Sequence, residues 1–140
     1  MTELQLQSLL ERIGEQLDGE MHVSSLMRHA YATDASVYRE TPLAVAIPRT
    51  DGDLQTLIEF ARDHQLSLVP RAAGTSLAGQ VVGNGIVVDI SRHFTRILEI
   101  NASQEWVRVQ PGVIRDELNL ALKPFGLMFG PETSTSNRAM

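Results

Sequence analysis

Residues 43–69 read LAVAIPRTDGDLQTLIEFARDHQLSLV, and this stretch predicts the fold class. It begins and ends with short apolar runs, Leu43–Ile47 and Leu66–Val69, which indicate buried strands. Between them, Thr50 and Asp53 form a capping-box pattern, and the apolar residues that follow recur at helical spacing. A strand, a helix and a second strand make a crossover connection, so we expect the two strands to be parallel.

The flanking sequence adds elements of both kinds. In chain order we expect a helix that begins after Thr2 and ends at Gly19, a short helix over Ser25–His29, a strand over Ile86–Ile90, a hairpin of Ile97–Ile100 with Trp106–Val109, and a helix over Val113–Leu122. The predicted fold class is therefore α/β (α+β in stricter usage), a small and mainly parallel sheet flanked by helices, plus a β-hairpin.

The composition of the 140-residue chain excludes several classes of protein. Without cysteine it has no disulfide, no cysteine-ligated metal centre and no thiol nucleophile. A net charge of −5 with a single lysine argues against a non-specific nucleic-acid binder. No uncharged apolar run approaches the roughly 18 residues of a transmembrane helix. The N-terminus lacks the basic region of a signal peptide, so we expect a cytoplasmic protein. The four histidines lack metal-ligand spacing, and no metal site is expected.

A glycine-rich loop, RAAGTSLAGQVVGNG at Arg71–Gly85, follows the second strand of the crossover. Glycines let successive backbone N–H groups converge on an anion, and Arg71 offers a bidentate charge. The loop is neither a Walker loop nor a dinucleotide fingerprint. On the residues alone, the commoner interpretation of the loop is a surface turn. For Arg71 a binding role is favoured, and a strand-end salt bridge is the alternative. A structural role is likewise favoured over a binding site for the loop residues Tyr31, Asp34 and Tyr38.

Three segments in this order resemble one family: RAAGTSLAGQ at 71–80, VRVQPGV at 107–113 and PETSTSN at 131–137. They are similar to the FAD-binding domain of the vanillyl-alcohol-oxidase/PCMH superfamily, in its D-lactate dehydrogenase, glycolate oxidase and 2-hydroxyglutarate dehydrogenase branch. Residues 31–50 resemble the start of that domain in large bacterial enzymes fused to an iron–sulfur module. The resemblance divides the chain into an N-terminal helical segment, 1–29, and the N-terminal part of a truncated FAD-binding domain, 30–140.

The resemblance implies non-covalent FAD, because Thr75 takes the position of the histidine that some members bond to the flavin. The cofactor-binding residues that it implies are Arg71, Ala72, Ala73, Gly74, Thr75, Ser76, Leu77, Gly79, Gln80, Pro111, Gly112, Val113, Pro131, Glu132, Thr133, Ser134 and Asn137.

The resemblance also implies that the whole protein oxidises a small 2-hydroxy acid to the 2-oxo acid. Its catalytic residues are expected beyond Met140, so none is assigned here, and the chain by itself is expected to be inactive. An iron–sulfur module in the same longer chain, peripheral association with the inner membrane and dimerisation through an exposed truncation surface are further expectations. Two alternatives stay open: a non-catalytic phosphate- or nucleotide-binding module, and an interaction domain without a ligand.

Overall fold

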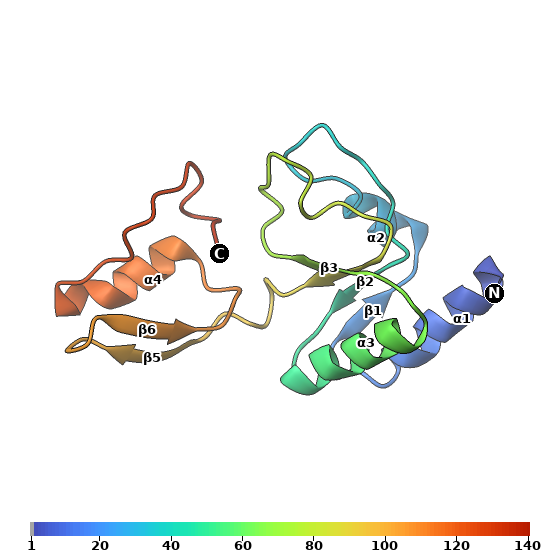
Figure 1. Ribbon diagram of the computed structural model, residues 1–140, viewed down its shortest axis with the longest axis horizontal. Coiled ribbons are helices and arrows are strands. Elements are labelled where there is room, and N and C mark those ends of the chain that lie inside the picture. Colours follow the sequence, from blue (N-terminus) through green and yellow to red (C-terminus); the bar gives the residue numbers. More distant parts are fainter. Residues whose placement is uncertain (1) are drawn as a thin grey trace.

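The computed structural model describes residues 2–140, which form two lobes joined just after residue 90 (Figure 1). The first lobe contains α1 (Glu3–Gly14), β1 (Glu20–His22), α2 (Ser25–Ala30), β2 (Ala44–Ile47), α3 (Asp51–Asp63), β3 (Leu68–Arg71) and β4 (Ile86–Asp89). The second contains β5 (Ile97–Asn101), β6 (Trp106–Val109), α4 (Arg115–Leu122) and the 3-10 helix η1 (Lys123–Phe125). Among residues 2–140, no helix is long and apolar enough to span a bilayer.

The first lobe is built on a four-stranded sheet with the order β1-β2-β4-β3. β4 pairs in parallel with both β2 and β3, and β1 pairs antiparallel with β2. The prediction that the two crossover strands are parallel is confirmed, and β4 lies between them. Arg71 and Asp89 are register partners at the carboxyl ends of β3 and β4.

The two faces of this sheet are covered differently. Every residue of β2 and β4 is buried, and alternate residues point to opposite faces. Residues from α1 and α3 cover one face in a single cluster: Leu10, Ile13, Leu57 and Phe60 pack with Ala44, Ala46, Ile86 and Val88. The other side of the sheet in Figure 1 is covered by α2, by the loop that follows α2 and by the loop that follows β3. α1 thus shares one core with the rest of the first lobe. The predicted boundary between an N-terminal segment, 1–29, and a domain that begins at residue 30 stays a prediction.

Element ends differ from the predictions where the chain must turn. α1 ends at Gly14 and not at Gly19, because the chain folds back there into β1: a Cβ on Gly14 would lie 2.7 Å from Met21 Cβ. β1 itself was not predicted, since three residues carry no periodic signal. β3 begins two residues late, because the Leu66 N–H still bonds the Ala61 carbonyl at the end of α3 (2.8 Å).

The second lobe pairs β5 and β6 as the expected antiparallel hairpin, with α4 packed on it. α4 begins at Arg115 rather than at Val113, because Ile114 is still extended (ψ 134°) and forms the N-cap. Val113, Leu118 and Leu122 all point into the lobe's core, as predicted. At the junction of the lobes the Gly112 N–H donates to the Phe94 carbonyl (2.7 Å). The predicted α/β class, with a mainly parallel sheet and a hairpin, is confirmed.

Candidate functional site

A cleft of about 440 Å³ lies where the two lobes meet. The first lobe lines it with residues at the carboxyl ends of β3 and β4 and at the end of α2. The second lobe lines it with Ile114 and with residues near the C-terminal end, namely 137, 138 and 140. We call it the interlobe cleft. Ligands of parallel α/β sheets commonly bind outside the carboxyl ends of the strands, so its position favours a binding site.

The interlobe cleft is positively charged although the chain as a whole is acidic. Arg71, Arg92 and Arg138 line it. Within residues 2–140, none of these guanidinium groups forms an ion pair with a carboxylate. Asp89 also lines the cleft, but both of its oxygens already accept hydrogen bonds. Arginines without acidic partners favour an anionic ligand.

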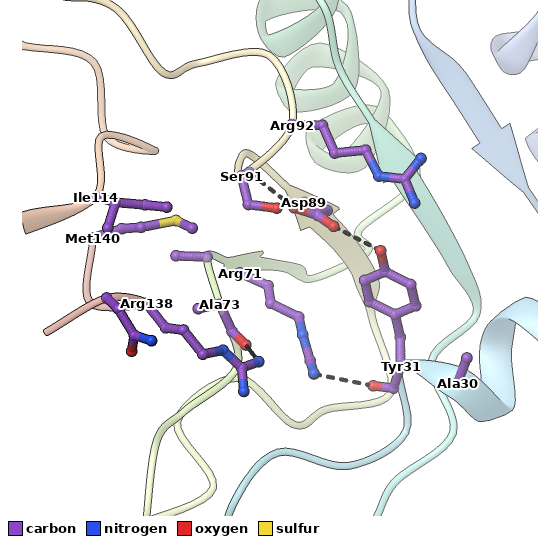
Figure 2. Close-up of a pocket in the computed structure, with 12 residues that line it drawn as sticks. Ala30, Tyr31, Arg71, Ala73, Asp89, Ser91, Arg92, Ile114, Arg138 and Met140 are labelled. Carbon is purple, nitrogen blue, oxygen red and sulfur yellow. Dashed lines mark hydrogen bonds between the residues drawn. The ribbon is translucent and has the colours of Figure 1, made fainter. Parts of the chain in front are cut away.

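Asp89 is held by Tyr31, which comes from the segment after α2 (Figure 2). The Tyr31 hydroxyl donates to Asp89 Oδ2 at 2.6 Å, and the Ser91 N–H donates to Oδ1 at 2.8 Å. Burial, together with the hydrogen bond and negative charge of Asp89, raises the pKa of Tyr31 to about 12. Tyr31 therefore stays protonated at neutral pH and remains a hydrogen-bond donor.

Arg71 points toward the main chain of residues 31–33. Its Nη1 donates to the Thr33 carbonyl at 2.8 Å and lies 3.5 Å from the Tyr31 carbonyl, a contact drawn in Figure 2. In the described residues it makes no salt bridge, so the alternative of a strand-end ion pair is wrong. Its predicted role toward a ligand stays a prediction.

The glycine loop, residues 72–85, begins at the wall of the interlobe cleft, where Ala72 and Ala73 line it. In the chain as described, the backbone N–H groups of residues 72–77 donate to no protein acceptor. Gly74 and Gly79 have φ of 68° and 70°, the left-handed region that side chains rarely adopt. A run of free amides with such glycines can hold a phosphate, so the loop fits the ligand expected of it.

Ser76 closes this loop on itself. Its Oγ accepts from the N–H groups of Ala78 (3.2 Å) and Gln80 (3.3 Å) and donates to Gln80 Oε1 (2.5 Å). Leu77 is exposed, and Thr75 is half-buried. The Ser76 hydroxyl and the Gln80 side-chain amide therefore both stabilise the turn.

The other predicted segments differ in where they lie. Asn137 lines the interlobe cleft, and the adjacent Arg138 bonds the Ala73 carbonyl across it (3.2 Å). Pro131 accepts from Arg115 Nε (2.6 Å), and this end of the segment is exposed together with Glu132, Thr133 and Ser134. None of Pro131–Ser134 is among the described residues that line the cleft.

Pro111-Gly112-Val113 forms the junction between the lobes rather than a wall of the cleft. A Cβ on Gly112 would lie 2.7 Å from the Ile90 carbonyl oxygen and 2.8 Å from that of Phe94. Val113 is buried in the second core. Whether this segment touches a cofactor stays a prediction.

Sequence reasoning missed Asp89, Arg92 and Arg138, which line the cleft. Asp89 carried a usable signal, because it ends the apolar run IVVD of a strand that is otherwise purely apolar. A charged residue at the carboxyl end of a buried parallel strand is placed at the edge where ligands bind. Arg138 carried no such signal in the sequence, because it reaches Ala73 only through the packing of residues near 140 against the first lobe.

Comparison with known proteins identifies the family. Residues 42–140 match the family described as FAD binding domain. The chain belongs to this family. The expected resemblance to FAD-linked oxidases is thereby confirmed, and the match supports FAD as the cofactor.

Relatives of this FAD-binding domain are dehydrogenases and oxidases. D-2-hydroxyglutarate dehydrogenase of Haemophilus influenzae is 45% identical over 128 residues, which are 89% of this chain and 12% of the relative. Glycolate oxidase subunit GlcD of Bacillus subtilis is 32% identical over 114 residues, 80% of this chain and 24% of the relative. The chain thus spans less than a quarter of either relative's length.

A solved structure supports the fold. The 4-ethylphenol oxidase from Gulosibacter chungangensis superposes with a TM-score of 0.76 at 20% identity, over 90% of this chain and 26% of the oxidase. At that identity the likeness shows a shared fold alone.

Proposed function

We propose that this chain binds the phosphate-bearing part of FAD for a dehydrogenase that oxidises a 2-hydroxy acid to the 2-oxo acid. The observation that carries the proposal is the interlobe cleft: three arginines without acidic partners line it, and the free amides of residues 72–77 adjoin it. A diphosphate needs charge and several hydrogen-bond donors together, and this edge of the sheet offers both.

The residues proposed to contact FAD are the seventeen cofactor-binding residues that the resemblance implies, with Arg92 and Arg138 added. The 71–80 segment offers backbone amides. Asn137 and Arg138 offer side-chain donors from the opposite wall of the cleft. We infer non-covalent binding, because a threonine at position 75 has no ring nitrogen to bond the flavin.

When bound, the flavin takes up the two electrons released as the C–H and O–H bonds of the hydroxy acid give way to a carbonyl, with loss of two protons. This chain's share is to hold and orient the cofactor and to balance its negative charge. The substrate class rests on the names of the relatives, D-2-hydroxyglutarate dehydrogenase and glycolate oxidase. Residues that bind or deprotonate the hydroxy acid are proposed to lie outside this chain, which would then be inactive alone.

A FAD titration tests the proposal, both on this chain and on a chain extended by about 100 residues, a further domain's length. We expect tight FAD binding by the extended chain and weak binding by the 140-residue chain. Arg138→Ala should weaken FAD binding about tenfold or more, since a charged hydrogen bond contributes about 1.5–3 kcal/mol. Arg62→Ala is the matched control, because Arg62 is exposed on α3 and pairs with Asp63 (2.9 Å).

Parallel titrations with ADP and riboflavin locate the contact and weigh the alternative function. If the cleft holds the diphosphate, ADP should compete with FAD and riboflavin should not. Equal affinity of the extended chain for ADP and FAD would favour a general nucleotide-binding module. Stoichiometric yellow flavin on the desalted 140-residue chain would refute the expectation that the chain binds FAD weakly.

A further inference from the structure

Residues 31–41, which we call the brace segment, lie beside the glycine loop although they are far from it in sequence (Figure 1). The segment is folded into a narrow turn by the bridge of Thr33 with Arg39 and by the Glu40 N–H, which donates to the Ala32 carbonyl at 2.9 Å. Within the segment, Ala32 is fully buried. The brace segment therefore has a defined shape of its own.

The first contact between the brace segment and the glycine loop runs through Arg71. The guanidinium bonds the Thr33 carbonyl at 2.8 Å and lies 5.2 Å from the centre of the Tyr31 ring. On its other side it lies against Gly74, where an added Cβ would collide with it. Arg71 is thus packed between the brace segment and the start of the glycine loop.

Tyr31 holds that guanidinium in position. The Arg71 guanidinium lies over the Tyr31 ring, and the Tyr31 hydroxyl donates to Asp89 Oδ2 at the end of β4 (2.6 Å). Asp89 is only 5% exposed, and Ser91 fixes its second oxygen. A rigid strand end therefore determines where the brace segment begins.

A second contact lies near the far end of the loop. The Tyr38 ring covers Gly79, where a Cβ would lie 2.7 Å from Tyr38 Cδ2. Within the brace segment the Ser36 N–H donates to Asp34 Oδ1 at 2.8 Å, and hydrogen bonding from Ser36 holds the pKa of Asp34 below its ordinary value. Both positive-φ glycines of the loop are thus covered, one by Arg71 and one by Tyr38.

We propose that the brace segment positions the glycine loop for its ligand, with Tyr31 and Arg71 as the positioning residues. The inference rests on the proposed function, because the ligand in question is the FAD diphosphate. A loop without regular structure loses conformational freedom when it closes on an anion, and a loop that is already ordered loses less. The brace segment supplies that order before the ligand arrives.

Tyr31→Phe tests the inference, since it removes one hydroxyl and keeps the ring under Arg71. Backbone ¹⁵N order parameters are measured for the ligand-free 140-residue chain. We expect those of residues 72–82 to fall from about 0.8 to below about 0.6, while those of β4 and α3 stay unchanged. FAD affinity of the extended chain should fall about tenfold.

Tyr38→Phe is the matched control on the same segment. Among the described residues the Tyr38 hydroxyl donates to no acceptor, so its removal should change neither loop order nor FAD affinity. If Tyr31→Phe fails to fold, the order parameters of ligand-free Arg71→Lys test the same point, because lysine keeps the charge but lacks the planar guanidinium that lies over the Tyr31 ring and donates through Nη1 to the Thr33 carbonyl.

Loss of order confined to residues 72–82, with weaker FAD binding, supports the brace. Unchanged order in that loop, order lost throughout the first lobe, or unchanged affinity despite a mobile loop overturns it. If the wild-type extended chain binds no FAD, the proposed function fails, while pyrophosphate affinity and the order parameters still decide whether the brace positions an anion-binding loop.

Discussion

The two lobes reach stability in different ways. In the first, two strands are buried along their whole length, and α1 and α3 share one core with them. In the second, a two-stranded hairpin and one helix bury a core of three residues, and Leu120, Phe125, Met128 and Phe129 stay exposed. An isolated hairpin is only marginally stable in water, so the stability of this lobe depends on the small core that β5 and β6 share with α4. The interlobe cleft therefore lies between a lobe with a large core and a lobe with a small one, and we expect the first lobe to be the more stable of the two.

The largest expected effect separates the two cores directly. Leu57→Ala, at a side chain with 0% exposure, should lower the free energy of unfolding by about 2–5 kcal/mol and loosen the whole chain. Leu118→Ala, at 6% exposure, should give a loss at the lower end of that range and loosen residues 97–140 alone. Denaturant titration with hydrogen exchange measures both. Global loosening by Leu118→Ala would show that the lobes form one cooperative unit.

A smaller effect tests how the first lobe is fastened at the start of α3. The Asp53 carboxylate accepts from the amides of Asp18 (2.9 Å), Gly19 (3.0 Å), Arg49 (2.7 Å) and Thr50 (3.3 Å). Asp53→Asn should cost about 1–3 kcal/mol in unfolding free energy, because part of this acceptor capacity is lost. Asp51→Asn, in the same helical turn, is the control and should change little.

The same carboxylate predicts the response of the first lobe to acid. Burial acts to raise the pKa of Asp53, but the four amides outweigh it and hold the pKa below its ordinary 3.8. Its stabilising contribution is therefore complete above about pH 4 and is lost as the pH falls through the lowered folded-state pKa. Acid titrations of the wild type and Asp53→Asn should differ in this range. Identical profiles would contradict the assignment.

The smallest effect concerns the exposed apolar side chains of each lobe. Ile58→Gln in the first lobe, at 57% exposure, and Leu120→Gln in the second, at 71%, should each change the unfolding free energy by less than about 0.5 kcal/mol. Thermal denaturation measures both. A loss of more than 1 kcal/mol at Leu120 alone would mean that this face of the second lobe is covered in solution.

Local patterns explain which elements could be predicted. The capping boxes at Thr2 and Thr50 and the apolar runs of β2 and β4 are complete within a few residues of sequence. β1 is formed only because β2 offers it an edge, and its three residues have no pattern of their own. The close packing of Gly112 against the Ile90 and Phe94 carbonyls could not be predicted, because no local signal indicates it.

By itself the sequence determined the α/β class, the glycine loop and the family, because each depends on residues that are neighbours along the chain. Only the tertiary structure decided that β4 lies between β2 and β3, that Tyr31 reaches Asp89, and that Arg138 meets Ala73. These pairs are distant in sequence, and their contact depends on how sheet, loops and lobes pack together. The positive charge of the interlobe cleft in an acidic chain has the same origin. The composition gives the number of arginines, but only the packing of the chain places three of them around one cleft.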